Sequence, residues 1–148
     1  MMQTERTTER TRGDGGFVPY ETTTRGIRIS VEPDFLESES EPSDDHYVWA
    51  YTVRIENGSD DVVTLLSRLW HITDADGRTV SVQGDGVVGE QPTLRPGDAF
   101  EYTSGCPLGT PSGLMRGAYA MVTADGERFT AQVPAFSLDS PHDWHRLN

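Results

Sequence analysis

The 148-residue chain is predicted to be an all-β protein, an antiparallel β-sandwich of about seven strands. Three observations lead to this prediction. Apolar and polar residues alternate with a period of two in several stretches, Gly, Pro, Asn and Asp residues separate these stretches, and no window of ten or more residues carries an apolar stripe of helical period. Because no segment is suited to a long crossover, neighbouring strands should pair antiparallel.

The first two strands show the alternation directly. Segment 27–31 alternates Ile27, Ile29 and Val31 with polar residues, and Pro33 is expected to end it. Segment 46–56 has the clearest pattern, since its apolar and aromatic residues fall on one face and such residues fit a pleated surface. These residues are Tyr47, Trp49, Tyr51, Val53 and Ile55.

Turn signals define the remaining strands. The dipeptides Asn57-Gly58, Asp76-Gly77 and Asp125-Gly126 favour tight turns, and Gly/Pro-rich loops are expected at 84–98 and 105–113. The strands predicted between these signals are 62–73, 78–83, 99–104, 114–123 and 128–138. The expected core residues are Trp49, Tyr51, Val53, Ile55, Trp70, Tyr119, Met121 and Phe129. Tyr119 is either a tyrosine corner or an ordinary core tyrosine.

The chain is expected to contain one domain. Residues 1–20 are rich in Thr, Glu, Arg and Gly without apolar periodicity, and they are predicted to be a disordered N-terminal extension. The β-sandwich domain is assigned to 21–141, and 142–148 is expected to be a frayed tail. This length suits one hydrophobic core.

Charge narrows the classes of partner. The chain has 24 acidic and 12 basic residues, all of the latter Arg, for a net charge of −12. Such a field repels phosphate polyanions and anionic lipid heads, so neither nucleic-acid binding nor binding to a membrane surface is expected. Membrane insertion is not expected either, because no apolar run is long enough to span a bilayer. A single cysteine, Cys106, cannot form an internal disulfide and fits a reducing compartment. The prediction is a soluble cytoplasmic domain.

One glycine-rich stretch matches G-x-G-x-x-G at Gly84, Gly86 and Gly89. Dinucleotide binding requires a helix directly afterwards, whereas 90–96 holds two prolines and no helical period. Asp85 also adds negative charge where a phosphate would bind. A turn with glycines at positive φ is the favoured interpretation. The candidate ligand-binding residues of this loop are Gly84, Asp85, Gly86, Gly89 and Glu90.

A weak cation site is the other candidate. If neighbouring strands alternate in direction, loops 57–61, 84–98 and 124–127 share one end of the sandwich. That end would gather the acidic residues Asp60, Asp61, Asp85, Glu90, Asp98, Asp125 and Glu127. The candidate ligands for Mg²⁺ or Ca²⁺ are Asp60, Asp61, Asp85 and Asp125. The favoured alternative is that they are separate, solvated loop acids, because their spacing fixes no coordination shell.

Catalytic residues are not apparent in the sequence. Ser104-Gly105 follows Tyr102 where a G-x-S-x-G motif needs glycine, and Cys106 has no base nearby in sequence. No C-x-x-C or H-E-x-x-H zinc motif is present. We therefore expect no enzymatic activity and no cofactor.

Several segments taken together resemble the ApaG family, also called CorD. The resemblance runs from about Thr22 to Asp139, and its most specific parts are VQGDGVVGEQP followed by PGDAFEYTSG. Leu69 departs from the family, which usually has an aromatic residue or His before the tryptophan. The resemblance implies a fibronectin type III-like sandwich with no established enzyme activity, an association with Co²⁺/Mg²⁺ resistance or efflux, and a Gly-rich loop that has been read as a pyrophosphate site.

Two classes of function therefore remain open. The first is a domain that binds another protein, with a homodimer through an edge strand as a related arrangement. The second is direct binding of a divalent cation, or of pyrophosphate or a nucleotide, at the Gly-rich loop. The chain is not expected to be a transporter itself. An ion needs a protein pathway across the bilayer, and no segment of this chain approaches the roughly 18 apolar residues of a spanning helix.

Overall fold

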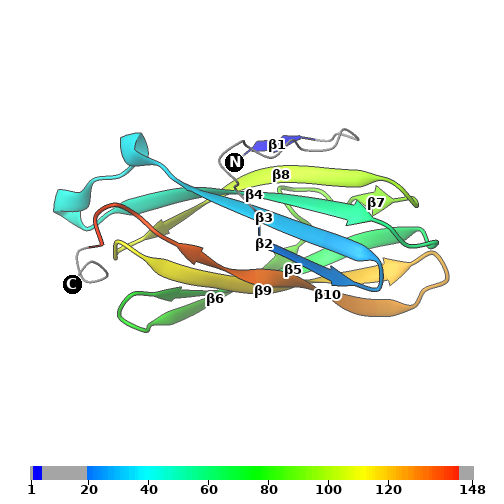
Figure 1. Ribbon diagram of the computed structural model, residues 1–148. Helices are drawn as coiled ribbons and strands as arrows, with labels where there is room; N and C mark the ends of the chain where they lie inside the picture. Colours follow the sequence, from blue (N-terminus) through cyan, green and yellow to red (C-terminus); the bar gives the residue numbers. More distant parts are fainter. Residues whose placement is uncertain (1, 5–19, 144–148) are drawn as a thin grey trace.

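Two antiparallel sheets pack face to face in the computed structural model, which describes residues 2–4 and 20–143 (Figure 1). The first sheet has the order β1-β8-β4-β3-β2, and the second has the order β10-β9-β5-β6, with β7 also pairing to β5. The strands of the first sheet are β1 (Met2–Thr4), β2 (Tyr20–Thr24), β3 (Ile27–Phe35), β4 (Tyr47–Asn57) and β8 (Ala99–Leu108). Those of the second are β5 (Val63–Asp74), β6 (Thr79–Asp85), β7 (Thr93–Leu94), β9 (Gly113–Thr123) and β10 (Arg128–Leu138). The predicted all-β sandwich is confirmed.

The seven predicted strands correspond to β3, β4, β5, β6, β8, β9 and β10. The strands β1, β2 and β7 were not predicted, because each is short and none shows apolar alternation. Two short 3₁₀-helices, η1 (Glu37–Glu39) and η2 (Pro42–Asp44), lie between β3 and β4. The predicted loop 105–113 is wrong at its start, since β8 continues to Leu108, which pairs with Tyr47 of β4.

The core lies between the sheets and contains the residues that alternation predicted. Trp49, Val53 and Ile55 of β4 are at most 1% exposed, and Trp70, Tyr119 and Met121 are buried opposite them in the second sheet. Tyr119 is a core residue and not a tyrosine corner, because its hydroxyl bonds to the hydroxyl of Tyr102 instead of to a backbone group. Of the eight predicted core residues only Phe129 is partly exposed; it packs against the core beneath the Arg25 guanidinium.

One long side of the sandwich is closed by bonds between β2 and β10. The Thr22 hydroxyl donates to the Gln132 carbonyl at 2.6 Å, and the Gln132 amide donates to the Thr24 hydroxyl at 3.3 Å. On the other side the chain between β6 and β7 crosses the gap and inserts Val87, which is fully buried. This segment is the Gly-rich stretch of the sequence, so its placement decides where the candidate site lies.

The predicted terminal segments fall mostly outside the described residues. Within 1–20, residues 2–4 form β1, in which Met2 pairs with Thr103 of β8, and Tyr20 begins β2. Within 142–148, the His142 Nε2 atom lies 3.1 Å from a Glu37 carboxylate oxygen. At its first residue, therefore, the expected tail is still in contact with the domain.

Candidate functional site

The Gly-rich segment lies along the side of the sandwich and not at its end. Asp85, the last residue of β6, is paired with Ser67, whereas Leu94 of β7 is paired with Val63. Both β6 and β7 therefore use the same edge of β5, and the chain between them passes beside the middle of that strand. The Gly86 amide donates to the Leu66 carbonyl at 2.8 Å, which holds the segment against β5.

This placement shows that the acidic residues expected together at one end of the sandwich do not all lie there. The pairs Val63 with Thr123 and Glu56 with Ala99 show that the loops before Val63, after Thr123 and before Ala99 do share one end. Asp85 and Glu90 are not part of it, because they follow β6 at mid-sheet. No group of three or more His, Cys, Asp and Glu side chains in the described ranges is placed to hold a metal ion. The candidate set Asp60, Asp61, Asp85 and Asp125 is thus divided between two places.

Local backbone geometry explains why glycine is found at two positions of the segment. Gly86 has φ +64°, and a Cβ there would overlap the Glu90 carbonyl oxygen. Gly89 has φ +83° in a two-residue turn, 87–90, in which the Val87 and Glu90 amides each donate to the other's carbonyl at 2.8 Å. The turn interpretation of the sequence is therefore confirmed for these two glycines.

A phosphate-binding loop needs free backbone amides directed at one point, followed by a helix. Here the amides of Gly86, Val87 and Glu90 already donate to backbone carbonyls. The next regular element is the short strand β7. The segment therefore has the spacing of a dinucleotide motif without its geometry.

Val88 is the strained residue of the turn. Its φ is +42°, although a β-branched side chain disfavours the left-handed region. With Gly89 it forms the corner of a turn in which both central residues have positive φ, a conformation that normally selects Asn or Gly first. Val88 packs against the core and lines a pocket, and backbone strain of this kind is often found where a site is shaped.

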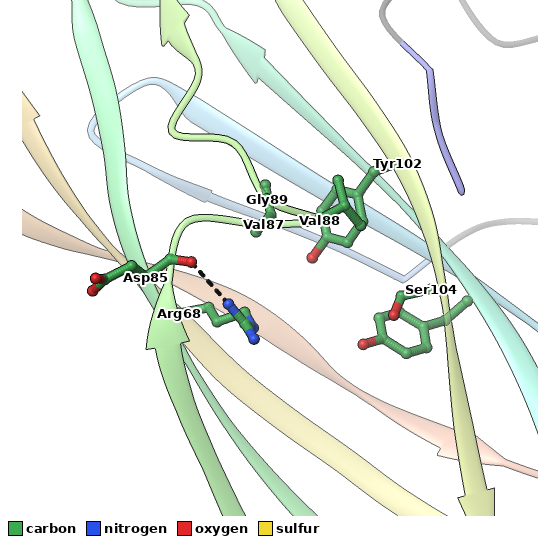
Figure 2. Close-up of a pocket in the computed structure, with 8 residues that line it drawn as sticks. Arg68, Asp85, Val87, Val88, Gly89, Tyr102 and Ser104 are labelled. Atoms are coloured by element: carbon green, nitrogen blue, oxygen red, sulfur yellow. Dashed lines mark hydrogen bonds between the residues drawn. The ribbon is translucent and has the colours of Figure 1, made fainter. Parts of the chain in front are cut away.

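The pocket has a volume of about 220 Å³ and lies between the two sheets beneath the turn 87–90 (Figure 2). One wall comes from β4 and β8 of the first sheet, the other from β5 and the end of β6, and the turn forms the roof. Its lining residues are Tyr51, Arg68, Asp85, Val87, Val88, Gly89, Tyr102 and Ser104. Of the predicted loop residues Asp85 and Gly89 are included, whereas Gly84, Gly86 and Glu90 are not.

Sequence reasoning missed the cationic residue of this pocket, Arg68. Its position in a predicted strand, two residues before Trp70, gave no sign that it lines a pocket, because the other lining residues come from distant segments of the chain. Burial raises the pKa of Tyr51 and of Tyr102, so that both hydroxyls stay protonated at neutral pH. The pocket therefore presents a permanent cation and neutral hydroxyl groups.

Two further side chains have the chemistry of nucleophiles but not the surroundings. Burial raises the pKa of Cys106 to about 11, which keeps its sulfur a thiol at neutral pH. The His71 Nδ1 atom lies 2.8 Å from the Ser81 hydroxyl, a distance compatible with a base and a nucleophile. This pair lies on the outer surface of β5 and β6, where Arg116 is paired with His71 in register, and not in the pocket between the sheets.

The fold defines a class of protein: a two-sheet β-sandwich of the fibronectin type III-like kind, with a pocket at its side. Residues 37–123 match the ApaG domain, and the chain belongs to this family. It is 58% identical to Protein ApaG of Rhodospirillum centenum over 129 residues, which cover 87% of this chain and 99% of that protein. It is 61% identical to Protein ApaG of Parvibaculum lavamentivorans over 123 residues, 83% and 95% of the two chains.

A solved structure shows the same fold. The crystal structure of the ApaA protein from Bordetella pertussis superposes with a TM-score of 0.76 at 45% identity, covering 84% of this chain and 98% of that one. Across residues 2–4 and 20–143, no helix is long and apolar enough to cross a membrane.

Proposed function

We propose that the protein is a non-enzymatic binding domain that takes an extended segment of another protein onto the edge of β6. The observation that carries this proposal is the state of that edge. All residues of β6 except Gly84 are exposed, and none from Thr79 to Gly84 is charged or proline. Natural sheets usually protect such edges with charges, prolines or short strands, so an open one favours strand addition.

The two valines of β6 support this proposal. Val80 and Val82 are paired with Ile72 and Trp70 of β5 and continue their apolar row, yet they are 61% and 39% exposed. An added strand would hydrogen-bond to the β6 backbone, and its alternate side chains would cover these valines. The partner expected from this chemistry is an uncharged, β-branched segment in extended conformation.

The association with Co²⁺/Mg²⁺ resistance or efflux, which the sequence resemblance implies, belongs to the same proposal. The domain would act through the protein that it binds and not as a transporter. A deletion strain complemented with the wild type should recover cobalt tolerance, whereas complementation with the variant Val80→Lys/Val82→Lys should not.

The direct test uses a library of displayed linear peptides selected on the full chain. Selected peptides should bind Val80→Lys/Val82→Lys at least tenfold more weakly, because two ammonium groups would be buried under the added strand. Leu114→Lys, at a 43% exposed position on β9, is the matched control and should bind normally. Amide exchange at Thr79–Asp85 should slow on binding. Peptides that bind both variants equally would contradict the proposal, and self-association abolished by Val80→Lys/Val82→Lys would identify a second copy as the partner.

A further inference from the structure

Arg68 lines the pocket between the sheets next to a residue that has no side chain, Gly84. It is paired in register with Gly84 of β6 and Tyr119 of β9, two residues before the buried Trp70 on the same face of β5. A Cβ at Gly84 would lie 2.9 Å from both terminal guanidinium nitrogens. Gly84 is not among the glycines with positive φ, so backbone conformation does not require glycine there, but a side chain at this position would have to displace the guanidinium.

The guanidinium is held without being neutralised. Its Nη1 atom donates to the carbonyl oxygens of Asp85 at 3.0 Å and Gly86 at 2.9 Å, and both acceptors are uncharged. Figure 2 shows the Asp85 carboxylate directed away from Arg68. In the part of the chain that the structure describes, Arg68 makes no ion pair, although other arginines do. These paired arginines are Arg25, Arg28, Arg54, Arg78 and Arg95.

Hydroxyl groups from the first sheet face this cation. Tyr51 of β4 and Ser104 of β8 line the opposite wall together with Tyr102, as Figure 2 shows for the two residues of β8. The positive charge of Arg68 acts on the Tyr51 hydroxyl and favours its ionised form, yet burial outweighs it and raises the pKa of Tyr51. The Tyr51 and Ser104 hydroxyls therefore remain neutral. They are hydrogen-bonded to each other, which leaves one hydroxyl proton of the pair to donate to an acceptor group that enters between them and the guanidinium.

We propose that this pocket binds the carboxylate of a small organic acid and that Arg68 is the residue that recognises it. The planar guanidinium fork matches a carboxylate, and one cation balances one negative charge. The apolar part of the acid would contact Val88 and the tyrosine rings. This inference is independent of the proposed strand addition at β6.

Size and charge set the class of ligand. The volume of about 220 Å³ suits an acid of a few carbon atoms. Pyrophosphate would bring several negative charges to one arginine beside Asp85. The structure therefore favours a monocarboxylate over a polyphosphate.

The experiment follows backbone amide shifts of the full chain by NMR during addition of butyrate, butyramide or inorganic pyrophosphate. Butyrate should give saturable shifts at Gly86, Val88 and Gly89, while butyramide, its neutral isostere, should not. Arg68→Gln should weaken butyrate binding at least tenfold. Arg116→Gln, which removes an exposed arginine from the outer face of the same sheet, is the control and should bind normally.

Further variants keep the test decisive. Arg68→Lys retains the charge without the fork and should bind with intermediate affinity. If Arg68→Gln does not fold, Ser104→Ala, which removes the opposite hydroxyl without adding bulk, should weaken butyrate binding with Arg68 in place. Val80→Lys/Val82→Lys should bind butyrate like the wild type. Equal shifts with butyramide, shifts with pyrophosphate alone, no shifts with butyrate, or butyrate binding unchanged in Arg68→Gln would each overturn the proposal.

Discussion

The hydroxyl oxygen of Tyr102 lies 2.6 Å from that of Tyr119, and this hydrogen bond joins β8 of the first sheet to β9 of the second across the core. Tyr102 is 2% exposed and Tyr119 is fully buried, so each hydroxyl satisfies the other away from water. A buried polar group costs free energy unless it is paired, and this bond is therefore specific to one relative position of the sheets.

The first prediction concerns this pair. Tyr119→Phe should lower the free energy of unfolding by about 1–3 kcal/mol, because it leaves the Tyr102 hydroxyl buried without its partner. Tyr102→Phe should cost a similar amount, while Tyr102→Phe/Tyr119→Phe should cost clearly less than the sum of the two. Urea unfolding of the four proteins gives the coupling energy, and additive losses would show that the bond contributes nothing.

The second prediction compares two glycines that both have positive φ but different surroundings. Gly77 has φ +86°, and a Cβ there would meet no atom within 4 Å, so the cost of Gly77→Ala is that of the backbone conformation alone, about 1–2 kcal/mol. Gly86→Ala adds an overlap with the Glu90 carbonyl to this cost, for a total of about 2–5 kcal/mol. Thermal unfolding of both variants checks the order. Equal losses would mean that the turn 87–90 moves freely away from β5.

The third prediction concerns the strain at Val88. Val88→Asn should stabilise the protein by about 1 kcal/mol, or a rise in melting temperature of about 2–4 °C, since Asn-Gly suits a turn with two positive φ angles. Val82→Asn makes the same exchange on a strand with ordinary φ and should give no gain. A lower melting temperature for Val88→Asn would show that the packing of Val88 against the core outweighs its backbone strain.

Local patterns were sufficient for the seven longest strands and the core, but not for β1, β2 and β7. The alternation in β4 predicted the buried row from Tyr47 to Ile55, because the two faces of a strand differ in burial whatever lies further along the chain. The errors at strand ends involve proline. Pro33 lies inside β3 and Pro107 lies inside β8. The neighbouring strand on the outer side does not reach either proline, because β2 pairs with β3 only as far as Val31 and β1 pairs with β8 only from Glu101 to Thr103. Each proline therefore sits where the outer edge needs no amide donor.

The pocket could not be predicted in the same way, because its parts are brought together by the fold. The spacing of the glycines indicated a turn, but the position of that turn depends on β6 and β7 sharing the edge of β5. The same fact separates Asp85 from the acids at the strand ends. Arg68 gains its role only when Gly84 leaves it room and when Tyr51 and Ser104 arrive from the other sheet.

The fourth prediction concerns alkaline pH. Burial raises the pKa of Cys106 from 9.0 to about 11, and it also raises the pKa of Tyr102 and Tyr119 above their ordinary value of 10.0. At a pH between the ordinary pKa of such a group and its raised pKa in the folded protein, the folded protein keeps a proton that the unfolded chain releases. The unfolded state thus binds fewer protons, and the free energy of unfolding falls as pH rises.

The expected profile is therefore flat below about pH 9 and then declines, with each fully buried group contributing up to about 1.4 kcal/mol per pH unit. Urea midpoints measured from neutral pH to about pH 11 test this. Cys106→Ala should make the decline shallower at its onset, because the unfolded thiol titrates at a lower pH than the tyrosines. A midpoint that stays constant across this range would show that these side chains reach solvent without unfolding.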